Sequence, residues 1–188
     1  MNETNEITRF PFWQWNDEGL PKELCEIVMR DMETMNDTDA SIGAGYSNQI
    51  VKKIRNSKVR WADSNYWLEG IMFNYGRYAN YTAGWNFNIW YPEHIQLTSY
   101  SKKQHYDWHE DWSPLDSSKD VRKVSVVILL NDPSEFEGGE FEFKHEGKVD
   151  LKQGSVIAFP SFLQHRVNPV TKGIRKSAVC WIAGPKTL

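Results

Sequence analysis

The segment IQLTSYSKKQHYDWHED, residues 95–111, combines a strand-like run with a histidine-rich end. It closes on His109-Glu110-Asp111, a His-x-Asp triplet, and His165 follows downstream with Arg175 ten residues beyond it. Two histidines and one carboxylate can hold ferrous iron by three ligands and leave coordination positions open. Residues two apart in a strand point to the same side, so His109 and Asp111 are predicted to face one way. His165 would add the third ligand from another strand.

The remaining histidines give competing readings. A second triplet, His105-Tyr106-Asp107, lies four residues before the first, and spacing alone leaves both triplets open. If His109 and Asp111 are the metal ligands, His105 and Asp107 are expected at the mouth of the site or as hydrogen-bond partners of the ligands. His94 follows a Tyr-Pro-Glu sequence, and His145 lies in a short turn-like stretch, so both are expected in loops.

The sequence pattern changes after residue 84 to short strand-like runs separated by turns. Seven short runs are expected to form strands, over residues 86–91, 95–101, 123–130, 140–144, 148–151, 155–159 and 174–182. Short strands at this spacing indicate a sandwich or jelly roll. The pair Gly138-Gly139 is expected in a hairpin or bulge rather than a phosphate loop, because no helix follows it.

Two helices are expected before the strands. The first has Pro21 in its first turn, and the second is capped by Asp63 or Ser64 and ends before Gly84. Their apolar stripes are Leu24, Ile27, Val28, Met32 and Met35 in the first, and Trp67, Ile71, Tyr75 and Tyr78 in the second. Residues 10–15 are expected to be extended, with Pro11 keeping them off the interior of a sheet.

Composition agrees with one domain over residues 1–188. A chain of 188 residues with 40% hydrophobic content can bury a single core. The formal net charge of -3, and the lack of any run of five basic residues, argue against general nucleic-acid binding. The polar start does not resemble a secretory signal, and no apolar stretch approaches the length of a membrane span. We therefore expect a cytoplasmic protein without a membrane partner, with Cys25 and Cys180 reduced. The oligomeric state is left open.

The order and spacing of the C-terminal residues resemble those of the prolyl 4-hydroxylase-like 2-oxoglutarate and iron(II)-dependent dioxygenases. The resemblance covers roughly residues 94 to 184 and rests on Tyr100, Tyr106, His109, Asp111, Ser125, Gly138-Gly139-Glu140, His165, Pro169-Val170, Gly173, Arg175 and Trp181. It implies a double-stranded β-helix, a form of jelly roll, with helices packed on one side. The predicted division is then a helical support region over residues 1–84 and a β core with the metal site over residues 85–184.

The resemblance assigns roles to single residues. It places the iron ligands on His109, Asp111 and His165 and favours the second triplet, because Tyr106 stands three residues before His109. It places the anchor for the distal carboxylate of 2-oxoglutarate on Arg175, whose planar fork suits a carboxylate. Tyr100 would line the co-substrate pocket. Some relatives also carry a tyrosine hydroxyl near position 129, where this chain has Leu129.

The implied activity is hydroxylation of a C–H bond, with conversion of 2-oxoglutarate and O2 to succinate and CO2. Iron(II), 2-oxoglutarate, O2 and ascorbate are the expected cofactors. A prolyl residue in a peptide or protein is the first substrate hypothesis, and a free amino acid or other small molecule stays open. Trp108 and Trp112, which flank the ligands, could form an aromatic wall for the substrate or belong to the core.

Two other classes of protein remain as alternatives. One is a non-catalytic binding module on a cupin-like scaffold. The other is a cupin-type isomerase or hydrolase that uses a divalent metal as a Lewis acid. Neither needs a buried cation for a five-carbon diacid, so Arg175 is the residue that separates them from the dioxygenase reading.

Overall fold

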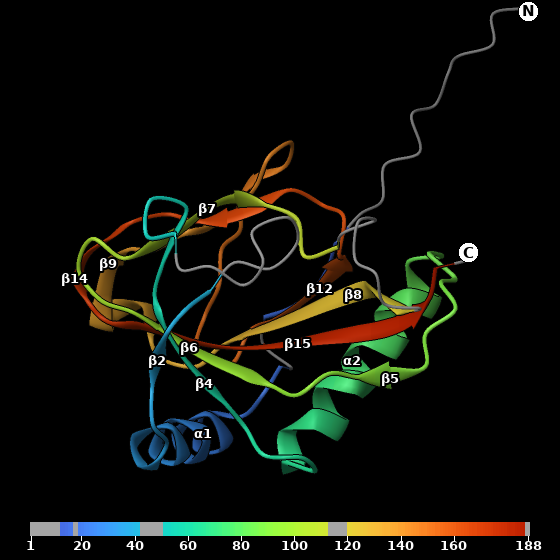
Figure 1. Ribbon diagram of the computed structural model, residues 1–188, viewed down its shortest axis with the longest axis horizontal. Helices are drawn as coiled ribbons and strands as arrows, with labels where there is room; N and C mark the ends of the chain where they lie inside the picture. The colour runs from blue at the N-terminus through green and yellow to red at the C-terminus, as the bar shows by residue number, and fades with distance from the viewer. Residues whose placement is uncertain (1–11, 17–18, 42–50, 113–119, 187–188) are drawn as a thin grey trace, which may run out of the picture.

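Two stacked antiparallel sheets form a double-stranded β-helix, with both long helices on the outer side of the larger sheet (Figure 1). The computed structural model describes residues 12–16, 19–41, 51–112 and 120–186. Its helices are α1 (Lys22–Thr34), α2 (Trp67–Thr82) and the short 3-10 turn η1 (Pro133–Glu135). This arrangement confirms the predicted jelly roll with helical support on one side.

The larger sheet has the order β1-β12-β8-β15-β6-β4-β2, with β5 also paired to β15. Its strands are β1 (Trp13–Trp15), β12 (Val156–Pro160), β8 (Asp120–Leu129), β15 (Arg175–Pro185), β6 (Gln96–Tyr100), β4 (Lys58–Trp61), β2 (Thr38–Asp39) and β5 (Tyr91–Pro92). The smaller sheet has the order β11-β10-β13-β7-β3. Its strands are β11 (Gly147–Lys148), β10 (Phe141–Phe143), β13 (His165–Val167), β7 (His105–His109) and β3 (Arg55–Asn56), and β14 (Val170–Gly173) pairs separately with β9 (Phe136–Gly138).

Strand β8 shows how one strand serves two faces. Val124, Val126 and Ile128 belong to the apolar cluster that packs against the helices, whereas Val127 belongs to the cluster between the sheets. Successive side chains of a strand point to opposite faces, so a nearly continuous apolar run can fill both clusters. Ser125 is the polar exception in this run, and it points to the inner side of the sheet, as does Val127.

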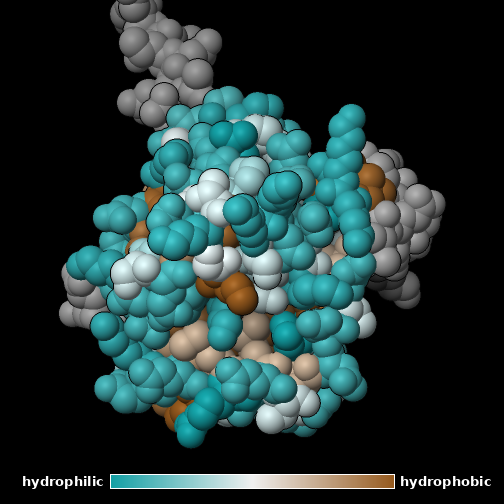
Figure 2. Space-filling view, turned by 90° about the vertical axis from the view of Figure 1, so that its left-hand side faces the viewer, coloured by the Kyte–Doolittle hydropathy of each residue, from teal (hydrophilic) through white to brown (hydrophobic). Residues whose placement is uncertain are grey.

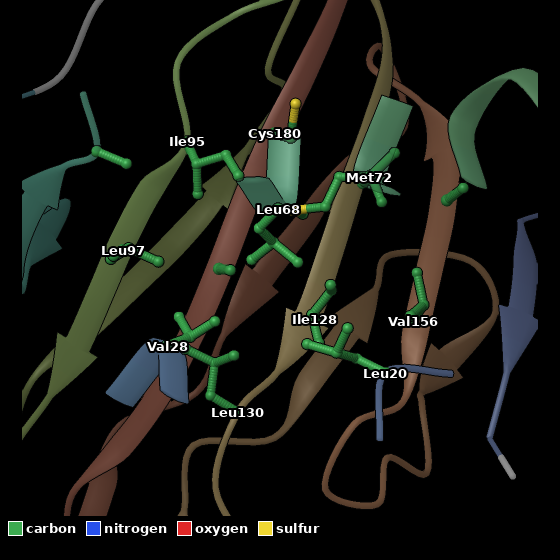
Figure 3. Packing of buried hydrophobic residues seen from close by; sticks show 14 of the residues in the cluster. Leu20, Val28, Leu68, Met72, Ile95, Leu97, Ile128, Leu130, Val156 and Cys180 are labelled. Carbon is green, nitrogen blue, oxygen red and sulfur yellow. The ribbon is translucent and has the colours of Figure 1, made fainter. Parts of the chain in front are cut away.

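Helix α2 packs on the outer face of the sheet through Leu68, Met72, Gly76 and Ala79 (Figure 3). The predicted stripe of Trp67, Ile71, Tyr75 and Tyr78 is one residue off this face, and Trp67 and Tyr78 are exposed. The small Gly76 decides the buried side, because a Cβ there would collide with Ile182 and lie 3.1 Å from Cγ2 of Val126. A helix carrying a bulky residue at this position could not lie so close to the sheet.

The N-terminal region is less helical than predicted. Four strands lie before residue 85: β1, β2 and β4 belong to the larger sheet, and β3 belongs to the smaller one. The expectation of a helical support region over residues 1–84 is therefore wrong for these segments. The assignment of all 188 residues to one domain stays a prediction. The expected extended segment at residues 10–15 is described only in part, and there β1 forms the edge of the larger sheet.

Two further expectations differ in detail. The predicted strand at residues 86–91 is reduced to Tyr91 and Pro92, because Asn86 adopts a left-handed conformation with φ 52° just after Gly84, which has φ 71°. Helix α2 has Tyr66 at its N-cap without a side-chain cap, so neither Asp63 nor Ser64 caps it. Instead the carbonyl of Asp63 accepts the backbone N–H of Tyr66 at 3.1 Å, closing a turn before the helix.

Both cysteines lie in the outer apolar cluster as free thiols, and burial raises the pKa of Cys25 to about 11 and that of Cys180 to about 12.

None of the helices among the described residues is long and apolar enough to cross a membrane. The face shown in Figure 2 is mostly hydrophilic with a small apolar area near its centre. Small exposed apolar areas are normal on monomeric surfaces, so this face gives no argument for a partner.

The close approach of α2 to the sheet can be tested with two alanine substitutions on the same helix. Gly76→Ala should lower the free energy of unfolding by about 1–3 kcal/mol, because its methyl group must displace Ile182. Gly70→Ala is the matched control, since no atom lies within 4 Å of its added Cβ. It should raise stability by about 0.5–1 kcal/mol through helix propensity. Urea denaturation followed by circular dichroism would measure both, and equal effects would contradict the packing argument.

Candidate metal centre

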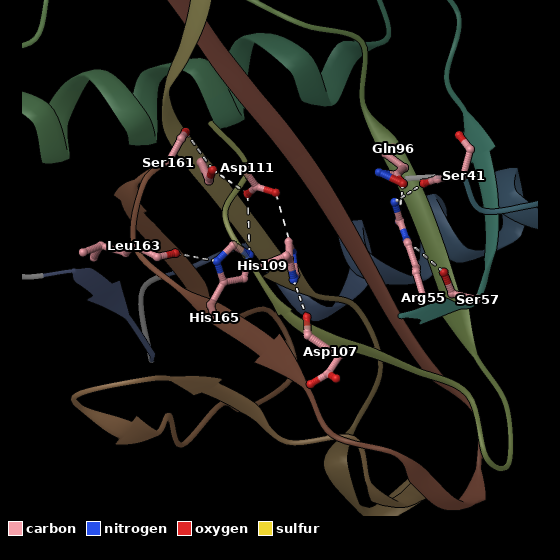
Figure 4. A network of polar contacts seen from close by, with 11 residues as sticks. Ser41, Arg55, Ser57, Gln96, Asp107, His109, Asp111, Ser161, Leu163 and His165 are labelled. Atoms are coloured by element: carbon pink, nitrogen blue, oxygen red, sulfur yellow. Dashed lines mark hydrogen bonds and ion pairs between the residues drawn. The ribbon is translucent and has the colours of Figure 1, made fainter. Parts of the chain in front are cut away.

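His109, Asp111 and His165 come together between the two sheets (Figure 4). Nε2 of His109 lies 3.7 Å from Oδ1 of Asp111, and Nε2 of His165 lies 3.6 Å from Oδ2 of the same carboxylate. Two ligands about 2.1 Å from one ion can be at most about 4.2 Å apart, so both distances fit a shared metal. The three side chains are 5–11% exposed. The structure thus brings together the three residues that the sequence singled out as ligands.

Each histidine is oriented by the carbonyl two residues before it. Nδ1 of His109 donates to the carbonyl of Asp107 at 2.7 Å, and Nδ1 of His165 donates to that of Leu163 at 2.8 Å. A carbonyl can only accept, so the proton of a neutral ring belongs on Nδ1. Nε2 is then the free lone pair on both rings, and it faces Asp111 in both cases. This is the tautomer that metal binding through Nε2 requires.

A one-residue bulge in β7 shapes the wall of the site. His165 pairs with His109 and Val167 pairs with Tyr106, so two steps on β13 match three on β7. In a regular strand Tyr106 and His109, three residues apart, would face opposite sides. The extra residue puts them on one side, and their rings stack with centroids 3.4 Å apart and planes 10° apart. Arg55 covers the other side of Tyr106, 4.5 Å from the ring centroid.

Asp111 lies just beyond the end of β7, so the prediction that both members of His-x-Asp lie within a strand is wrong in detail. Its backbone N–H donates to the carbonyl of Ser161 at 2.9 Å, which fixes the chain after the strand. Its Oδ2 accepts the hydroxyl of Ser125 at 2.7 Å, and that hydroxyl also lies 2.9 Å from Oγ of Ser161. A lone serine within an apolar strand was the sequence signal for this contact, whereas nothing pointed to Ser161.

Electrostatics favours the metal-binding protonation states of His109 and Asp111. Burial lowers the pKa of His109 well below its ordinary value, and the charge of His165 acts in the same direction. Burial alone would raise the pKa of Asp111, but the two histidines, Arg122 and the Ser125 hydrogen bond outweigh it and lower that pKa. A neutral imidazole and an ionised carboxylate are the metal-binding forms.

The competing triplet lies outside this cluster. His105 contacts two backbone carbonyls, with Nε2 3.1 Å from that of Lys53 and Nδ1 3.4 Å from that of Lys103. The carboxylate of Asp107 accepts the N–H of Trp108 at 2.8 Å. Among the described residues, the only group of three or more potential ligands within reach of one ion is the one that contains His109.

The other two histidines lie apart from the site. His94 precedes β6 in a segment without regular structure, and its Nδ1 is 3.7 Å from a carboxylate oxygen of Glu69. His145 lies in the turn between β10 and β11. Both positions are loops, as the sequence indicated.

Arg175 begins β15 and is 2% exposed. Its Nη1 donates to Oγ of Ser177 at 3.1 Å, and its Nη2 is buried without a hydrogen-bond partner among the described residues. The cation thus carries a buried donor with no acceptor, which costs free energy unless a ligand supplies one. Desolvation lowers the pKa of Arg175, a further sign that the site lacks a compensating carboxylate.

Tyr100 pairs directly with Arg175 across β6 and β15, and the guanidinium carbon lies 5.8 Å from its ring centroid. One member of the Gly138-Gly139 pair, Gly139, packs directly against the arginine. A Cβ at Gly139 would lie 3.1 Å from Cδ of Arg175 and 2.9 Å from Cγ2 of Val170. With φ 68°, Gly139 also has a backbone conformation that favours glycine. The structure therefore places Tyr100 and Gly139 next to Arg175, whereas the sequence indicated only Tyr100 and Arg175 for this pocket.

The flanking tryptophan Trp108 does not line the pocket. The guanidinium of Arg166 lies 4.4 Å over its ring, and Arg166 pairs with Glu142 at 2.7 Å on the outer side of the smaller sheet. Trp108 is therefore neither an aromatic wall of the site nor part of the apolar clusters. The backbone N–H of Trp112 donates to the carbonyl of Ser161 at 3.0 Å, and no described contact places its ring in the pocket.

His109 and His165 lie on two paired strands of a jelly roll, Asp111 follows directly after the first of them, and a buried arginine lies on the same inner side. This is the arrangement expected of an iron- and 2-oxoglutarate-binding β-helix protein. The comparisons agree. Residues 95–183 match the model of the 2OG-Fe(II) oxygenase superfamily. This part of the chain is therefore similar to that superfamily, and its resemblance to prolyl 4-hydroxylase-like proteins is confirmed.

Among curated proteins, a PKHD-type hydroxylase of Pseudoalteromonas atlantica is 34% identical over 94 residues. The match covers 46% of this chain and 41% of that protein, so the chain spans less than half of the length of this relative.

Two solved structures share the fold. The viral collagen prolyl hydroxylase vCPH from Paramecium Bursaria Chlorella virus-1, in its 2OG complex, has a TM-score of 0.71 at 21% identity, over 94% of this chain and 97% of that one. A Trichoplax adhaerens prolyl hydroxylase, in complex with a hypoxia inducible factor oxygen degradation domain peptide fragment, has a TM-score of 0.63 at 20% identity, over 95% and 86%. At these identities the likeness extends to the fold alone.

Measurements of metal affinity can test which of the two triplets binds the metal. Asp111→Ala should lower the affinity for Co²⁺, used as an air-stable probe, by more than about 100-fold, since it removes a ligand rather than a supporting group. Asp107→Ala is the matched control and should leave the affinity within about three-fold of that of the original protein, because its carboxylate contacts only a backbone N–H. Isothermal titration calorimetry measures both. The reverse pattern would assign the metal to the other triplet.

The hydroxyl of Ser125 should matter for the metal although it is not a ligand. Ser125→Ala removes the hydrogen bond to Oδ2 of Asp111, so the carboxylate loses its orientation. Co²⁺ affinity should fall by about 10–100-fold. The d–d absorption of the bound Co²⁺ should shift as its ligand geometry changes, and an unchanged spectrum and affinity would contradict this role.

Proposed function

We propose that this protein is a 2-oxoglutarate- and iron(II)-dependent dioxygenase that hydroxylates a C–H bond, with a prolyl residue of a peptide or protein as the substrate class. The iron ligands are His109, Asp111 and His165. The observation that carries the proposal is the buried, unpartnered Nη2 of Arg175 on the same inner side of the β-helix as the ligands. The match of residues 95–183 to the model of the 2OG-Fe(II) oxygenase superfamily supports it.

Bound iron and 2-oxoglutarate would supply the oxidation itself, in which O2 gives one oxygen atom to succinate and the other to the substrate, with loss of CO2. The residues of the chain hold the metal and the co-substrate in position. His109 and His165 offer Nε2 because their Nδ1 protons are held by backbone carbonyls. Asp111 stays ionised and fixed by Ser125. Arg175 holds the far carboxylate of the co-substrate at the closed end of the pocket.

The opposite end of the site offers an aromatic and cationic surface for the substrate. Arg122 lies 3.7 Å over the ring of Trp181 and forms two hydrogen bonds with Glu93, at 2.8 and 2.6 Å. Trp61, 51% exposed, has its ring 6.2 Å from that of Trp181. We infer that Trp181 and Trp61 supply the aromatic wall that the sequence suggested for Trp108 and Trp112. Aromatic rings suit contact with a proline ring or an extended peptide, and the peptide-bound Trichoplax structure has the same fold.

Three finer parts of the hypothesis rest on the sequence and the family. Ascorbate would serve as the reductant that restores iron(II) after uncoupled turnover. A cytoplasmic location is compatible with the two free, buried cysteines. A small-molecule substrate remains the alternative to a peptide.

The first experiment measures succinate formation from 2-oxoglutarate with iron(II), ascorbate and O2. The original protein should form succinate slowly even without a prime substrate, and His109→Ala should abolish it. His105→Ala should retain it, because His105 contacts only backbone carbonyls. Turnover that persists in His109→Ala would contradict the assignment. Failure of the original protein to bind any divalent metal would favour a non-catalytic binding module.

The role of Arg175 has its own test. Arg175→Lys should weaken 2-oxoglutarate binding by about ten-fold or more, since an ammonium cannot reproduce the planar fork. Metal affinity should not change. Lys176→Ala is the matched control, because the adjacent residue points to the other face of β15. Anaerobic titration of the metal-loaded protein measures both ligands, and equal 2-oxoglutarate affinity in both variants would refute the anchor.

A further inference from the structure

The two histidine ligands are packed in different ways. Three phenylalanines of the apolar cluster between the sheets surround the ring of His165, at centroid distances of 5.3, 6.3 and 4.7 Å: Phe141, Phe143 and Phe159. The ring contacts of His109 among the described residues are fewer, with His165 at 4.2 Å and with Tyr106 at 3.4 Å. Apart from the other ligand, a single aromatic side chain therefore packs against the imidazole of His109.

The stack with Tyr106 restricts the tilt of the His109 ring. The hydrogen bond from Nδ1 of His109 to the carbonyl of Asp107 sets the direction of one ring atom, but hydrogen bonds at carbonyl oxygens tolerate a broad range of directions. The two ring planes differ by only 10°. A tilt of the imidazole would push its edge into the tyrosine ring, so the stack fixes the plane in which Nε2 lies.

Arg55 lies on the opposite face of the Tyr106 ring. Its guanidinium carbon is 4.5 Å from the ring centroid, and it cannot share a face with the imidazole, which lies flat against the ring at 3.4 Å. A cation over an aromatic face is attracted to that face. Tyr106 is thus held between a cation and a metal ligand, and it cannot move back from His109 without displacing Arg55.

Three acceptors from three segments of the chain hold the guanidinium in place (Figure 4). Nε donates to Oγ of Ser57 at 3.3 Å, Nη1 to the carbonyl of Ser41 at 3.3 Å, and Nη2 to Oε1 of Gln96 at 2.5 Å. Gln96 belongs to β6 of the larger sheet, whereas Arg55 belongs to β3 of the smaller sheet, so the side chain joins the two sheets. The fixed directions of the guanidinium donors suit such a triple contact better than an ammonium does.

No ion pair explains the charge of Arg55. The residue is 9% exposed, its three acceptors are a hydroxyl, a backbone carbonyl and an amide, and it pairs with no carboxylate of the described residues. A buried cation without a counter-ion costs free energy, and an apolar side chain of similar length would fill the same space without that cost. A guanidinium is explained at this position if its shape and its donors have a task.

We propose that Arg55 is a positioning residue of the metal centre, which holds the Tyr106 ring against His109 and so fixes the plane of that imidazole for metal binding. The inference rests on the metal site of the proposed function. Arg55 is not a ligand, and its effect on the metal passes through the ring of Tyr106. It also lies outside residues 95–183, the part of the chain that matches the superfamily model.

A double-mutant cycle tests this path. Arg55→Met keeps a long side chain but removes the charge and the donors, and Tyr106→Leu removes the flat ring. Each should lower Co²⁺ affinity by about ten-fold and shift the d–d absorption of the bound Co²⁺, as expected when support for a ligand is lost. The double variant should bind no more weakly than Tyr106→Leu alone, because Arg55 then has no ring to hold. Additive losses would overturn the proposal.

Conservative and distant variants serve as controls. Tyr106→Phe keeps the ring and should restore the affinity and the spectrum that Tyr106→Leu loses. Arg55→Lys, a milder change that keeps the charge but not the fork, should shift both quantities in the same direction as Arg55→Met. Arg60→Met removes an arginine that contacts Ser99 and Asp37, and it should leave both quantities unchanged.

The outcomes separate this inference from the proposed function. If Arg55→Met binds Co²⁺ with the spectrum of the original protein, Arg55 has only a structural role and the inference is overturned, while the metal centre stands. If the original protein binds no Co²⁺, the metal centre and the proposed function are overturned with it. Isothermal titration calorimetry and absorption spectroscopy measure affinity and spectrum, and thermal unfolding of the metal-free variants checks that the fold is retained.

Discussion

The pairing of β15 with β8 in the middle of the larger sheet is the constraint on which the rest depends. The two strands run side by side from Ser177 and Leu129 to Pro185 and Asp120. Their alternation sends Ala178, Cys180 and Ile182 to the helices and leaves Arg175, Ser177 and Trp181 for the inner side. A slip of one residue would exchange the two sets, turning the arginine to the helix side of the sheet and the aliphatic residues to the inner side. The apolar core therefore fixes the register of the polar site.

Sequence reasoning worked best where chemistry restricts the choice of residue. Only a few residue types bind iron or clamp a carboxylate, so candidates could be picked by residue type, and the family resemblance assigned the roles to His109, Asp111, His165 and Arg175. The structure brings these four residues to one side of the β-helix. The long apolar strands were also visible as runs. Tertiary contacts decided the rest. Strands β3, β13 and β14 are too short to leave a pattern, and they exist because neighbouring strands offer backbone partners.

The errors have the same origin. The aromatic stripe of α2 looked like the buried face, yet Gly76 and Ala79 face the sheet because helix and sheet approach too closely for large side chains. Spacing could not choose between the two triplets. The backbone carbonyls that surround His105 are invisible in a sequence, as is the carbonyl of Ser161 that holds Asp111.

The bulge in β7 makes the metal centre depend on the length of the chain as well as on its residue types. The extra residue lies between Tyr106 and His109, opposite Arg166 of β13. Loss of one residue there would restore regular pairing and preserve every ligand in the sequence. It would also turn Tyr106 away from the imidazole that it now covers. Related chains that differ here by a single insertion or deletion would thus keep the written motif while losing the geometry behind it.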